Sequence, residues 1–441
     1  MEAGGLTITR ALYQGDGRVV LAPGIGEGDN GAMRGIHSLA RFRVALLVLS
    51  AASVVVLACN AIIGTRDNVR YDATAEAGSS GSAGNPGAVP GTPGGEPGSS
   101  SGSSGDGGVC GDTTSDARNC GRCNHDCLGG ACTASVCQPV VLVEAAGRPV
   151  TVVTNGNNVY VADYNGFVGR IDKTGPPGTL QILYDHTRSS SGEPDSPRAL
   201  TTDSTSFYFT SQYDGVYSCP LAGCTDAGPH FFGPASSSVN GIAVAPDGRL
   251  LGAGQTEILA GSKTGILNVL FDTNYGYDMA ADNAFMYFTR AGSLARADIN
   301  SDAGYTDLDP LRDAFSGFVA LSADRVFWTS ANNSQPGHVR SLLKSGAGGI
   351  TYPTPEADIR GIAVDATQVY WIAAGEAGAK NGALRVCPQT GCAASTKLIS
   401  NLNIGENVFV DDYAIYVAEY GTTASDPGGS TPGRILRLAK P

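Results

Sequence analysis

A four-residue turn recurs six times along the last two thirds of this 441-residue chain. Each copy ends in glycine after mostly small or polar residues, and the copies DKTG, PLAG, SKTG, SDAG, LKSG and PQTG end at Gly175, Gly223, Gly265, Gly304, Gly346 and Gly391. The intervals between these glycines run from 39 to 48 residues. A repeat of that length indicates tandem supersecondary units that stack on their neighbours. The sequence therefore predicts at least six such units.

Strand signals flank each turn. The fullest copies of the two runs that precede it are GIAVDATQVYWIAA from Gly361 and VNGIAVAPDGRLLGAG from Val239, and a further apolar run such as ILNVLFD follows it. Runs rich in Val, Tyr, Phe and Trp that are divided by Asp-containing turns are typical of antiparallel hairpins. We therefore expect four strands in each unit, named a to d in chain order, with the glycine turn between c and d.

Four-stranded antiparallel units in tandem predict a β-propeller over residues 138–441. The first strands of the units are expected to start near Thr151, Ala199, Gly241, Asp278, Phe318, Gly361 and Asn407. That count makes the fold class all-β with seven blades, and six blades are the alternative. The 61 glycines, the 23 prolines and a charged fraction of only 16% favour strands, turns and linkers over long charged helices.

The paired runs IAVD and VYWI, together with VYVAD and IYVAE, resemble the NHL and YWTD groups of β-propellers. The resemblance covers roughly residues 138–441 and implies the propeller architecture. It departs from the YWTD group in the number of units, since seven are counted here and that group has six.

The chain ends on RILRLAKP, residues 434–441, where the other units make the glycine turn and add a strand. This run aligns with VGRIDKT of the first unit, so Arg437 matches Arg170 and Lys440 matches Lys173. The run PVVLVE, residues 139–144, precedes the first strand a and has no partner of its own. We expect it to pair with residues 434–439, because this closes the ring and removes an exposed edge.

Ten of the eleven cysteines fall into two kinds of context. Four form close pairs around glycine turns, Cys219 with Cys224 and Cys387 with Cys392, and are predicted to be disulfides that fix those turns. The other six, within residues 110–137, are Cys110, Cys120, Cys123, Cys127, Cys132 and Cys137. So dense a set predicts a small disulfide-rich module in an oxidising, extracytoplasmic setting.

The N-C-G-x-C-x-x-x-C core of this module resembles the cysteine-rich modules of the stigma-specific protein type, which implies no catalysis. Six cysteines allow fifteen pairings, and the sequence does not choose among them. Zinc bound by Cys120, Cys123, His125 and Cys127 is the alternative to disulfides, although zinc sites usually separate two ligand pairs by a longer loop.

Residues 33–59 have the layout of a secretory signal, with a basic start, an apolar stretch from Val44, and Ala58 before Cys59. The ending V-L-A-C resembles the lipobox of bacterial lipoproteins. The resemblance implies that Cys59 carries lipid and becomes the N-terminus, and that Asn60 permits sorting to the outer membrane. The alternative is a single uncleaved transmembrane anchor, because the apolar run continues to Ile63 and reaches about 20 residues.

The flanking segments complete the organisation of the domains. Residues 1–32 precede the signal, and we expect translation to begin at Met33. Residues 60–109 are rich in Gly, Ser and Pro and lack the apolar side chains needed to offset the entropy of ordering, so they predict a disordered tether. A net charge of -12 and a pI near 4.8 argue against nucleic acid as a partner.

Two groups of residues are candidates for a site on the propeller. Polar residues at the start of the inner strands could surround the mouth of the central channel, and these are Arg198, Asn240, Asp278, Arg360 and Glu406. Loops between strands b and c could present a binding surface with Tyr164, Asn165, Gln212, Tyr213, Asn332, Asn333 and Tyr420. The large aromatics of strand b are interpreted instead as packing between blades.

Other motifs for chemistry are weaker. Asp298, Asn300, Asp302 and Asp309 have the spacing of a calcium loop, but Ala303 replaces the glycine of the sharp bend, and a polar hairpin turn is the preferred interpretation. Histidines 186, 230 and 338 fall at the end of a d strand, in a d strand and in a c strand. We therefore assign no catalytic residue, no metal ligand and no cofactor.

The sequence predicts an exported, lipid-anchored surface protein whose propeller binds a protein or a glycan without catalysis. The alternative is a metal-dependent lactonase or lyase acting at the central channel, because lactonases and streptogramin-type lyases share this predicted fold. An open set of oxygen ligands at the channel mouth would favour the enzyme, and pairing of arginines with acids there would oppose it.

Overall fold

The structure is a computed structural model that describes residues 66–67, 110–144, 146–185, 196–211, 215–224, 228–233, 238–291, 293–309, 315–332, 335–423, 426 and 429–441. The described residues belong to one compact unit, Ile63–Pro441. Residues 1–62 lie outside the described residues, and they include the predicted signal and Cys59. Of the predicted tether, only β1 (Arg66–Asp67) is described, where it pairs in parallel with Ala199 and Leu200. In the described ranges, no helix has the length and apolar character to span a membrane.

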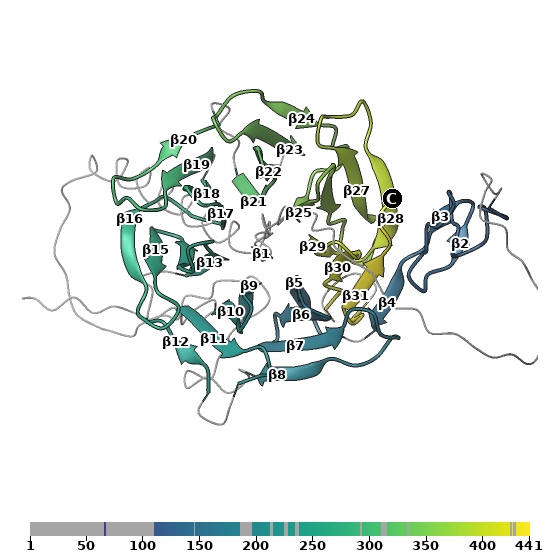
Figure 1. The fold of residues 1–441 in the computed structure, drawn as a ribbon, viewed down its shortest axis with the longest axis horizontal. Coiled ribbons are helices and arrows are strands. Elements are labelled where there is room, and N and C mark those ends of the chain that lie inside the picture. The colour runs from purple at the N-terminus through teal and green to yellow at the C-terminus, as the bar shows by residue number, and fades with distance from the viewer. Residues whose placement is uncertain are drawn as a thin grey trace, which may run out of the picture. The chain divides into compact units, whose positions relative to one another are not determined.

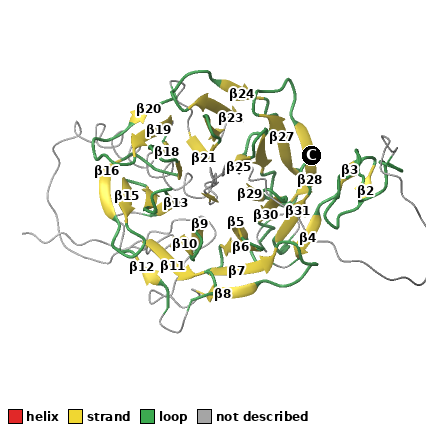
Figure 2. Ribbon diagram, in the orientation of Figure 1, coloured by secondary structure: helices red, strands yellow, loops and turns green. Residues whose placement is uncertain are grey.

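Seven sheets surround a central axis, each with four antiparallel blade strands, so the predicted seven-bladed propeller is confirmed (Figures 1 and 2). In one of them β1 is a fifth strand, parallel to its neighbour. Blade 1 contains β5 (Pro149–Asn155), β6 (Asn158–Asp163), β7 (Phe167–Asp172) and β8 (Gln181–Asp185). Blade 2 contains β9 (Pro197–Thr202), β10 (Ser206–Ser211), β11 (Gly215–Pro220) and β12 (His230–Phe231). Blade 3 contains β13 (Val239–Val244), β14 (Leu250–Gly254), β15 (Glu257–Gly261) and β16 (Asn268–Asp272). In each blade these strands are a to d in order.

The remaining blades follow the same pattern. Blade 4 contains β17 (Asp278–Ala281), β18 (Phe285–Arg290), β19 (Ser293–Asp298) and β20 (Thr306–Asp307). Blade 5 contains β21 (Phe315–Leu321), β22 (Arg325–Asn332), β23 (Gln335–Leu343) and β24 (Ile350–Tyr352), and blade 6 contains β25 (Ile359–Val364), β26 (Gln368–Ala373), β27 (Gly382–Pro388) and β28 (Thr396–Leu402). Blade 7 combines β29 (Gly405–Val410), β30 (Ile415–Glu419) and β31 (Arg434–Leu438) with β4 (Val140–Val143).

The ring therefore closes as the sequence predicts. Strand β4 pairs with β31 through Val143 with Ile435, Val141 with Leu436, and Val140 with Arg437. Arg437 lies opposite Tyr416 as Arg170 lies opposite Tyr160, so that part of the alignment is correct. The same register places Lys440 at the position of Lys173, but the two side chains make different contacts. Lys440 Nζ donates to the Asp411 carbonyl of its own blade at 2.9 Å.

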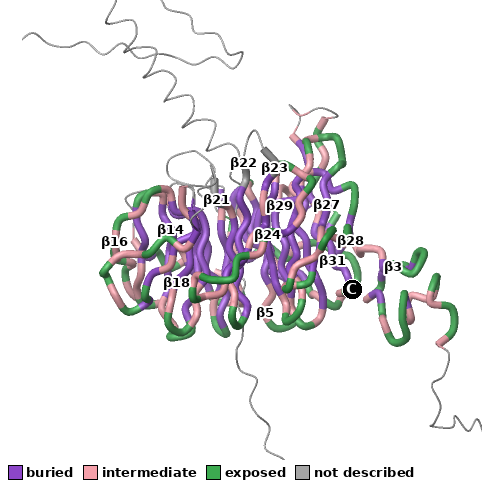
Figure 3. The backbone as a smooth tube through the Cα atoms, turned by 90° about the horizontal axis from the view of Figure 1, so that it is seen from above, coloured by how far each residue is buried: buried purple, intermediate pink, exposed green. Residues whose placement is uncertain are grey.

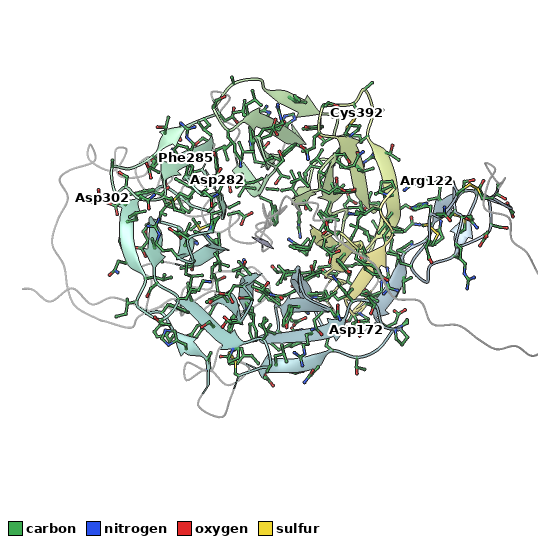
Figure 4. All side chains as sticks on the ribbon, viewed as in Figure 1. Arg122, Asp172, Asp282, Phe285, Asp302 and Cys392 are labelled. Carbon is green, nitrogen blue, oxygen red and sulfur yellow. A yellow bond between two sulfur atoms is a disulfide. The ribbon has the colours of Figure 1, made fainter. Side chains whose placement is uncertain are left out.

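Because successive strands alternate in direction, the a–b and c–d turns lie on one face of the ring, here called the turn face. The b–c loops and d–a connections lie on the other, here called the loop face. In Figure 4 Asp282, in an a–b turn, lies nearer the axis than Asp302, in a c–d turn. Figure 3 shows buried strands running between exposed turns at both faces.

An aspartate organises the a–b turn in four blades. The carboxylates of Asp203, Asp282, Asp365 and Asp411 each accept backbone N–H groups two and three residues further along. Asp side chains favour this local geometry because they satisfy the backbone donors of the turn. This explains why so many first strands in the sequence run into Asp.

The second residue of the glycine turn links neighbouring blades. Lys173 and Lys344 pair with Asp411 and Asp282 of the preceding blades, with Nζ to Oδ2 distances of 3.0 Å in both pairs. A third pair joins Lys263 to Asp203 at 2.5 Å. The recurring lysine of the turn thus binds the recurring aspartate in the a–b turn of the preceding blade, so the repeated residues form a contact between blades.

The backbone of the same turn residue is also bound by the preceding blade. The Arg170, Arg296 and Arg437 guanidiniums donate to the carbonyls of Leu221, Lys344 and Lys173 at 2.9, 2.6 and 2.5 Å. In blade 5 the Tyr352 hydroxyl donates to the Gln389 carbonyl at 2.6 Å. These donors come from strand c or d, so the outer parts of the blades are joined as well as the inner ones.

Disulfides Cys219–Cys224 and Cys387–Cys392 bracket the glycine turns of blades 2 and 6, as predicted. Their second turn residues are Leu221 and Gln389, so neither turn carries the lysine that binds the preceding blade in blades 1, 3 and 5. A covalent bridge within the turn thus accompanies the loss of an ion pair between blades.

Aromatic side chains of strand b fill the spaces between blades. The eight predicted packing residues are at most 2% exposed, and they are Tyr160, Tyr208, Tyr287, Phe327, Trp328, Tyr370, Trp371 and Tyr416. Nearer the axis the inner strands approach closely. A Cβ atom on Gly361 would lie 2.7 Å from the Cα of Asn407 in the next blade, which is why the GIAV run needs glycine there.

The cysteine-rich module, residues 110–137, is held by the disulfides Cys110–Cys123, Cys120–Cys132 and Cys127–Cys137. Its strands are only β2 (Cys132–Thr133) and β3 (Val136–Cys137). The three cysteines of the zinc alternative are all oxidised, and the ring nitrogens of His125 face the carbonyls of Cys120 and Lys440. The structure therefore contradicts a zinc site at these residues.

Candidate functional site

The start of strand a is irregular on the loop face. The pairing of strands a and b shifts register near this face in six blades, between residues such as Val239 and Gly241, or Gly405 and Asn407. Such bulges bend the strand and re-aim its side chains. Four of the predicted channel-mouth residues lie at or beside these bulges, namely Arg198, Asn240, Arg360 and Glu406, and Asp278 begins the one inner strand without a shift.

These channel-mouth residues bind the neighbouring blade. Asn240 donates to the Gly276 carbonyl at 2.9 Å, and the Asp278 carboxylate accepts the Val319 N–H at 2.9 Å. The Arg198 carbonyl accepts the Thr151 hydroxyl at 2.9 Å. The inner strands are therefore joined blade to blade around the axis, which gives this set a structural role.

The strongest electrostatic contact at the channel mouth joins Arg360 to Glu406 and Asp358. The Arg360 guanidinium pairs with Glu406 of blade 7 and lies 3.0 Å from Asp358 Oδ2. Burial lowers the pKa of Arg360, but Glu406 and Asp358 outweigh burial and hold the pKa above its ordinary value. This is the arginine-to-acid pairing that opposes a site for acid–base or metal chemistry.

The residues of the calcium-loop pattern do not converge. Asp298 accepts the Asn300 N–H within its own turn, and the Asn300 side chain accepts from Arg249 at 2.9 Å. Asp309 is buried and lies 3.4 Å from Arg340. Among the described residues, the carboxylates and histidines form no group of three that could hold an ion. The preferred interpretation as a polar turn therefore fits the geometry.

Two further predictions concern histidines and loops. His230 lies in β12 and His338 in β23, on the outer strands d and c as expected, and His186 lies outside the described residues. Of the b–c loop candidates, Tyr164, Asn165 and Tyr420 are described with their side chains. Gln212, Tyr213 and Asn333 lie outside the described residues, and nothing is described of the Asn332 side chain.

Tyr164 and Tyr420 come together on the loop face, where blades 7, 1 and 2 meet. Their ring centroids are 6.1 Å apart in an edge-on arrangement. The guanidinium carbon of Arg148 lies 5.7 Å from the centre of the Tyr420 ring, and that of Arg198 lies 5.8 Å from the centre of the Tyr164 ring. We call Arg148, Tyr420, Tyr164 and Arg198 the Arg–Tyr row.

All four side chains of the Arg–Tyr row are half-buried, so part of each remains accessible to solvent. Contacts of arginine with aromatic faces contribute about 0.5–1 kcal/mol each at exposed sites and fix the orientation of both groups. Burial raises the pKa of Tyr420, while the nearby Arg148 opposes the rise. Tyr420 is therefore neutral at neutral pH and can donate through its hydroxyl.

A buried aspartate orders the backbone beneath the row. The Asp163 carboxylate accepts the backbone N–H of Arg148 and, at 2.7 Å, that of Asn165. Burial raises the pKa of Asp163 to about 7, although these two N–H groups and Arg148 oppose the rise. Gly147 has a φ of 77°, and a Cβ there would lie 2.5 Å from Asp163 Oδ2, so glycine is required at this position.

Backbone pairs hold the same region from several segments. Tyr164 N–H donates to the Arg148 carbonyl at 2.9 Å, and Gly433 N–H donates to the Gly147 carbonyl at 2.8 Å. The connection from β4 to β5 is thereby tied to loops of blades 1 and 7. The row is preorganised, which lowers the entropy lost when a ligand binds.

Arg148 and Asp163 were not among the residues predicted from the sequence. Arg148 belongs to the short connection between β4 and β5, which has no counterpart in the repeat. Asp163 is the last residue of VYVAD. The repeat predicts a strand there, but it does not predict that the carboxylate is buried. The D-Y-N segment is a turn signal that could have drawn attention to Asp163, but no local signal joins it to Arg148.

No protein family matches this chain, and no curated protein matches it. Among solved structures, the WD40 β-propeller domain of Doa1 has a TM-score of 0.51 at 10% identity, over 67% of this chain and 95% of that domain. The Pan2 WD40 domain of Neurospora crassa has 0.49 at 11% identity, over 69% of this chain and 96% of that one. The extracellular domain of BT4673 from B. thetaiotaomicron has 0.48 at 13%, over 68% and 40%. At 10% identity the likeness to the Doa1 domain shows the propeller fold alone.

Proposed function

We propose that this protein is a binding protein whose propeller takes a protein or glycan ligand at the Arg–Tyr row. The observation that supports this proposal is the row itself, which presents two tyrosine rings between two guanidiniums across three blades. Tyrosine supplies a rigid contact area and a hydroxyl, and arginine supplies planar donors for carbonyl or carboxylate oxygens. Sugars and peptides both offer an apolar face edged by such oxygens.

The chemistry of the region favours binding over catalysis. Asp163 is fully buried, and both of its oxygens accept backbone N–H groups, so it positions loops rather than a substrate. At the channel mouth Arg360 and Glu406 neutralise one another. We propose that the propeller is of the NHL or YWTD type, and the runs IAVD, VYWI, VYVAD and IYVAE support this.

The binding proposal is tested by screening the exported chain on a glycan array and against surface proteins, with Tyr164→Ala and Tyr420→Ala beside the wild type. Each substitution should weaken the affinity for the ligand by about tenfold or more, because it removes an aromatic contact that contributes about 1.5 kcal/mol. Tyr413→Ala is the matched control, because Tyr413 is half-buried beside Lys173 in an a–b turn, on the turn face of blade 7. Equal loss of binding in all three variants would contradict the proposal.

We also propose that the chain is exported and held to the membrane by lipid on Cys59, with residues 60–109 as a tether. The basic, apolar and V-L-A-C segments of residues 33–59 support this. Metabolic labelling with a fatty-acid probe should mark the wild type and leave Cys59→Ser unmarked. If the purified protein kept residues 33–58 and carried no label, the result would contradict the lipid anchor and support the uncleaved transmembrane anchor.

A further inference from the structure

The ring has one seam that the chain does not cross. Strands of blades 1 to 6 follow one another in sequence, whereas blade 7 joins β4, near the start of the propeller, to β31, at the end of the chain. The backbone pairing of β4 with β31 closes the circle, together with contacts of blade 7 with blade 1 such as the pair Lys173–Asp411. Opening this seam would expose an unpaired strand edge, with Leu142 and Ile435 leaving the core.

The cysteine-rich module lies against the last residues of this seam. The His125 imidazole bridges two carbonyls, with Nδ1 2.5 Å from Cys120 O and Nε2 2.7 Å from Lys440 O. The Arg122 guanidinium, labelled in Figure 4, donates to the Pro441 carbonyl at 3.2 Å. Two module side chains thus hold the residues that follow β31.

Arg437 joins three segments at one point. Its guanidinium extends from β31 and donates to the Lys173 carbonyl of blade 1 and to the Leu128 carbonyl of the module. The side chain is only 5% exposed. Arginine can serve several carbonyls at once because its planar fork carries five N–H donors. The module is therefore bonded to the same side chain that fastens blade 7 to blade 1.

The module is also rigidly continuous with the other strand of the seam. Only Gln138 and Pro139 separate Cys137 from β4, and Gln138 N–H donates to the Ala131 carbonyl at 2.8 Å. The disulfide Cys127–Cys137 fixes the end of the module next to this link. Leu438 and Ala439 share one apolar cluster with four buried cysteines of the module. Both strands of the seam are thus held by one cross-linked piece.

We propose that the cysteine-rich module is a lock on the propeller seam. It holds β4 from its N-terminal side and the end of β31 through His125, Arg122 and the Leu128 carbonyl, so that the two strands separate only when the module releases residues 437–441. This role is independent of any ligand at the Arg–Tyr row, and loss of ligand binding would leave it unaffected.

Hydrogen exchange of the full chain tests the lock. The double variant Arg122→Ala/His125→Ala keeps all three disulfides and removes the module's side-chain contacts with residues 440 and 441. We expect amides in peptides covering residues 139–144 and 434–441 to exchange about tenfold faster, as loss of two hydrogen bonds of ordinary strength allows. Peptides from β25 and β26 in blade 6 should be unchanged. Arg118→Ala is the control, because this arginine of the module is exposed to solvent.

Unchanged exchange at the seam in the double variant would overturn the proposal, and so would an equal effect of Arg118→Ala. A second pair of variants separates the lock from general effects of disulfide loss. Cys127→Ala/Cys137→Ala should accelerate exchange at the seam, whereas Cys219→Ala/Cys224→Ala should act only within blade 2. If both pairs accelerated exchange throughout the ring, the module would be a general stabiliser and not a lock.

Discussion

The two faces of the propeller are built on different rules. On the turn face the same contacts recur, with lysine of one glycine turn bound to aspartate of the preceding a–b turn in three places. On the loop face of the described residues the Arg–Tyr row occurs once, and its members come from two b–c loops, a d–a connection and a strand a. Contacts that repeat serve the ring as a whole, whereas a contact that occurs once marks the place where one part of the ring can act differently.

The largest expected effect comes from breaking a turn-face contact. The Asp203 carboxylate is nearly buried and accepts from Lys263, two backbone N–H groups and the Tyr208 hydroxyl. Replacing Asp203 by alanine should lower the free energy of unfolding by about 3 kcal/mol, because charged hydrogen bonds are lost together. Denaturant titration measures this. Asp247→Ala in the exposed turn of blade 3 should cost about 0.5 kcal/mol, and equal losses in both variants would refute the comparison.

The two faces should also respond oppositely to pH. Burial raises the pKa of Asp163 to about 7, whereas for Asp203 the lysine and hydrogen bonds outweigh burial and lower the pKa. Between about pH 4 and 7 the folded protein keeps the proton on Asp163 that the unfolded chain releases. Its contribution to stability is therefore present below pH 4 and is lost as the pH rises to 7, with a slope of up to about 1.4 kcal/mol per pH unit. Asp203 contributes stability above its unfolded pKa, and this is lost in stronger acid.

Denaturant titrations of the wild type and Asp163→Asn between pH 4 and 8 measure the loop-face term. The variant should lose the slope, and it should be less stable than the wild type at pH 4, because an amide nitrogen would face the Arg148 N–H. If the unfolding free energy of the variant kept the same dependence on pH, the group that titrates would not be Asp163.

The smallest expected effects come from single lysines on the turn face. Lys173→Met, Lys263→Met and Lys344→Met should each lower the free energy of unfolding by about 0.5–1 kcal/mol, because these pairs are partly screened by water. The triple variant should show the sum, since the three pairs belong to different blade boundaries. Lys397→Met on exposed β28 is the control, and a cost equal to that of Lys173→Met would argue against a special contact.

Most of the fold could be predicted from the sequence, because the structure of a blade depends on interactions between residues close together in the chain. Asp203 and Asp411 form their turns with residues two and three positions away, and the GIAV runs place glycine where inner strands approach. These signals predicted the number of blades, the two turns bracketed by disulfides and the pairing of β4 with β31. The candidate site could be predicted only in part. Tyr164 and Tyr420 were predicted as separate loop residues, and Arg148 was not predicted.

What the sequence by itself determined is the unit that repeats, since turn chemistry and alternation of apolar residues act over a few positions. Only the tertiary structure decided which residues of different units meet. Lys173 and Asp411 are 238 residues apart, and Arg437 and Leu128 are 309 apart. Contacts over such separations depend on the angle at which each blade packs against the next, and no local pattern records that angle. The contacts within the Arg–Tyr row belong to the same class.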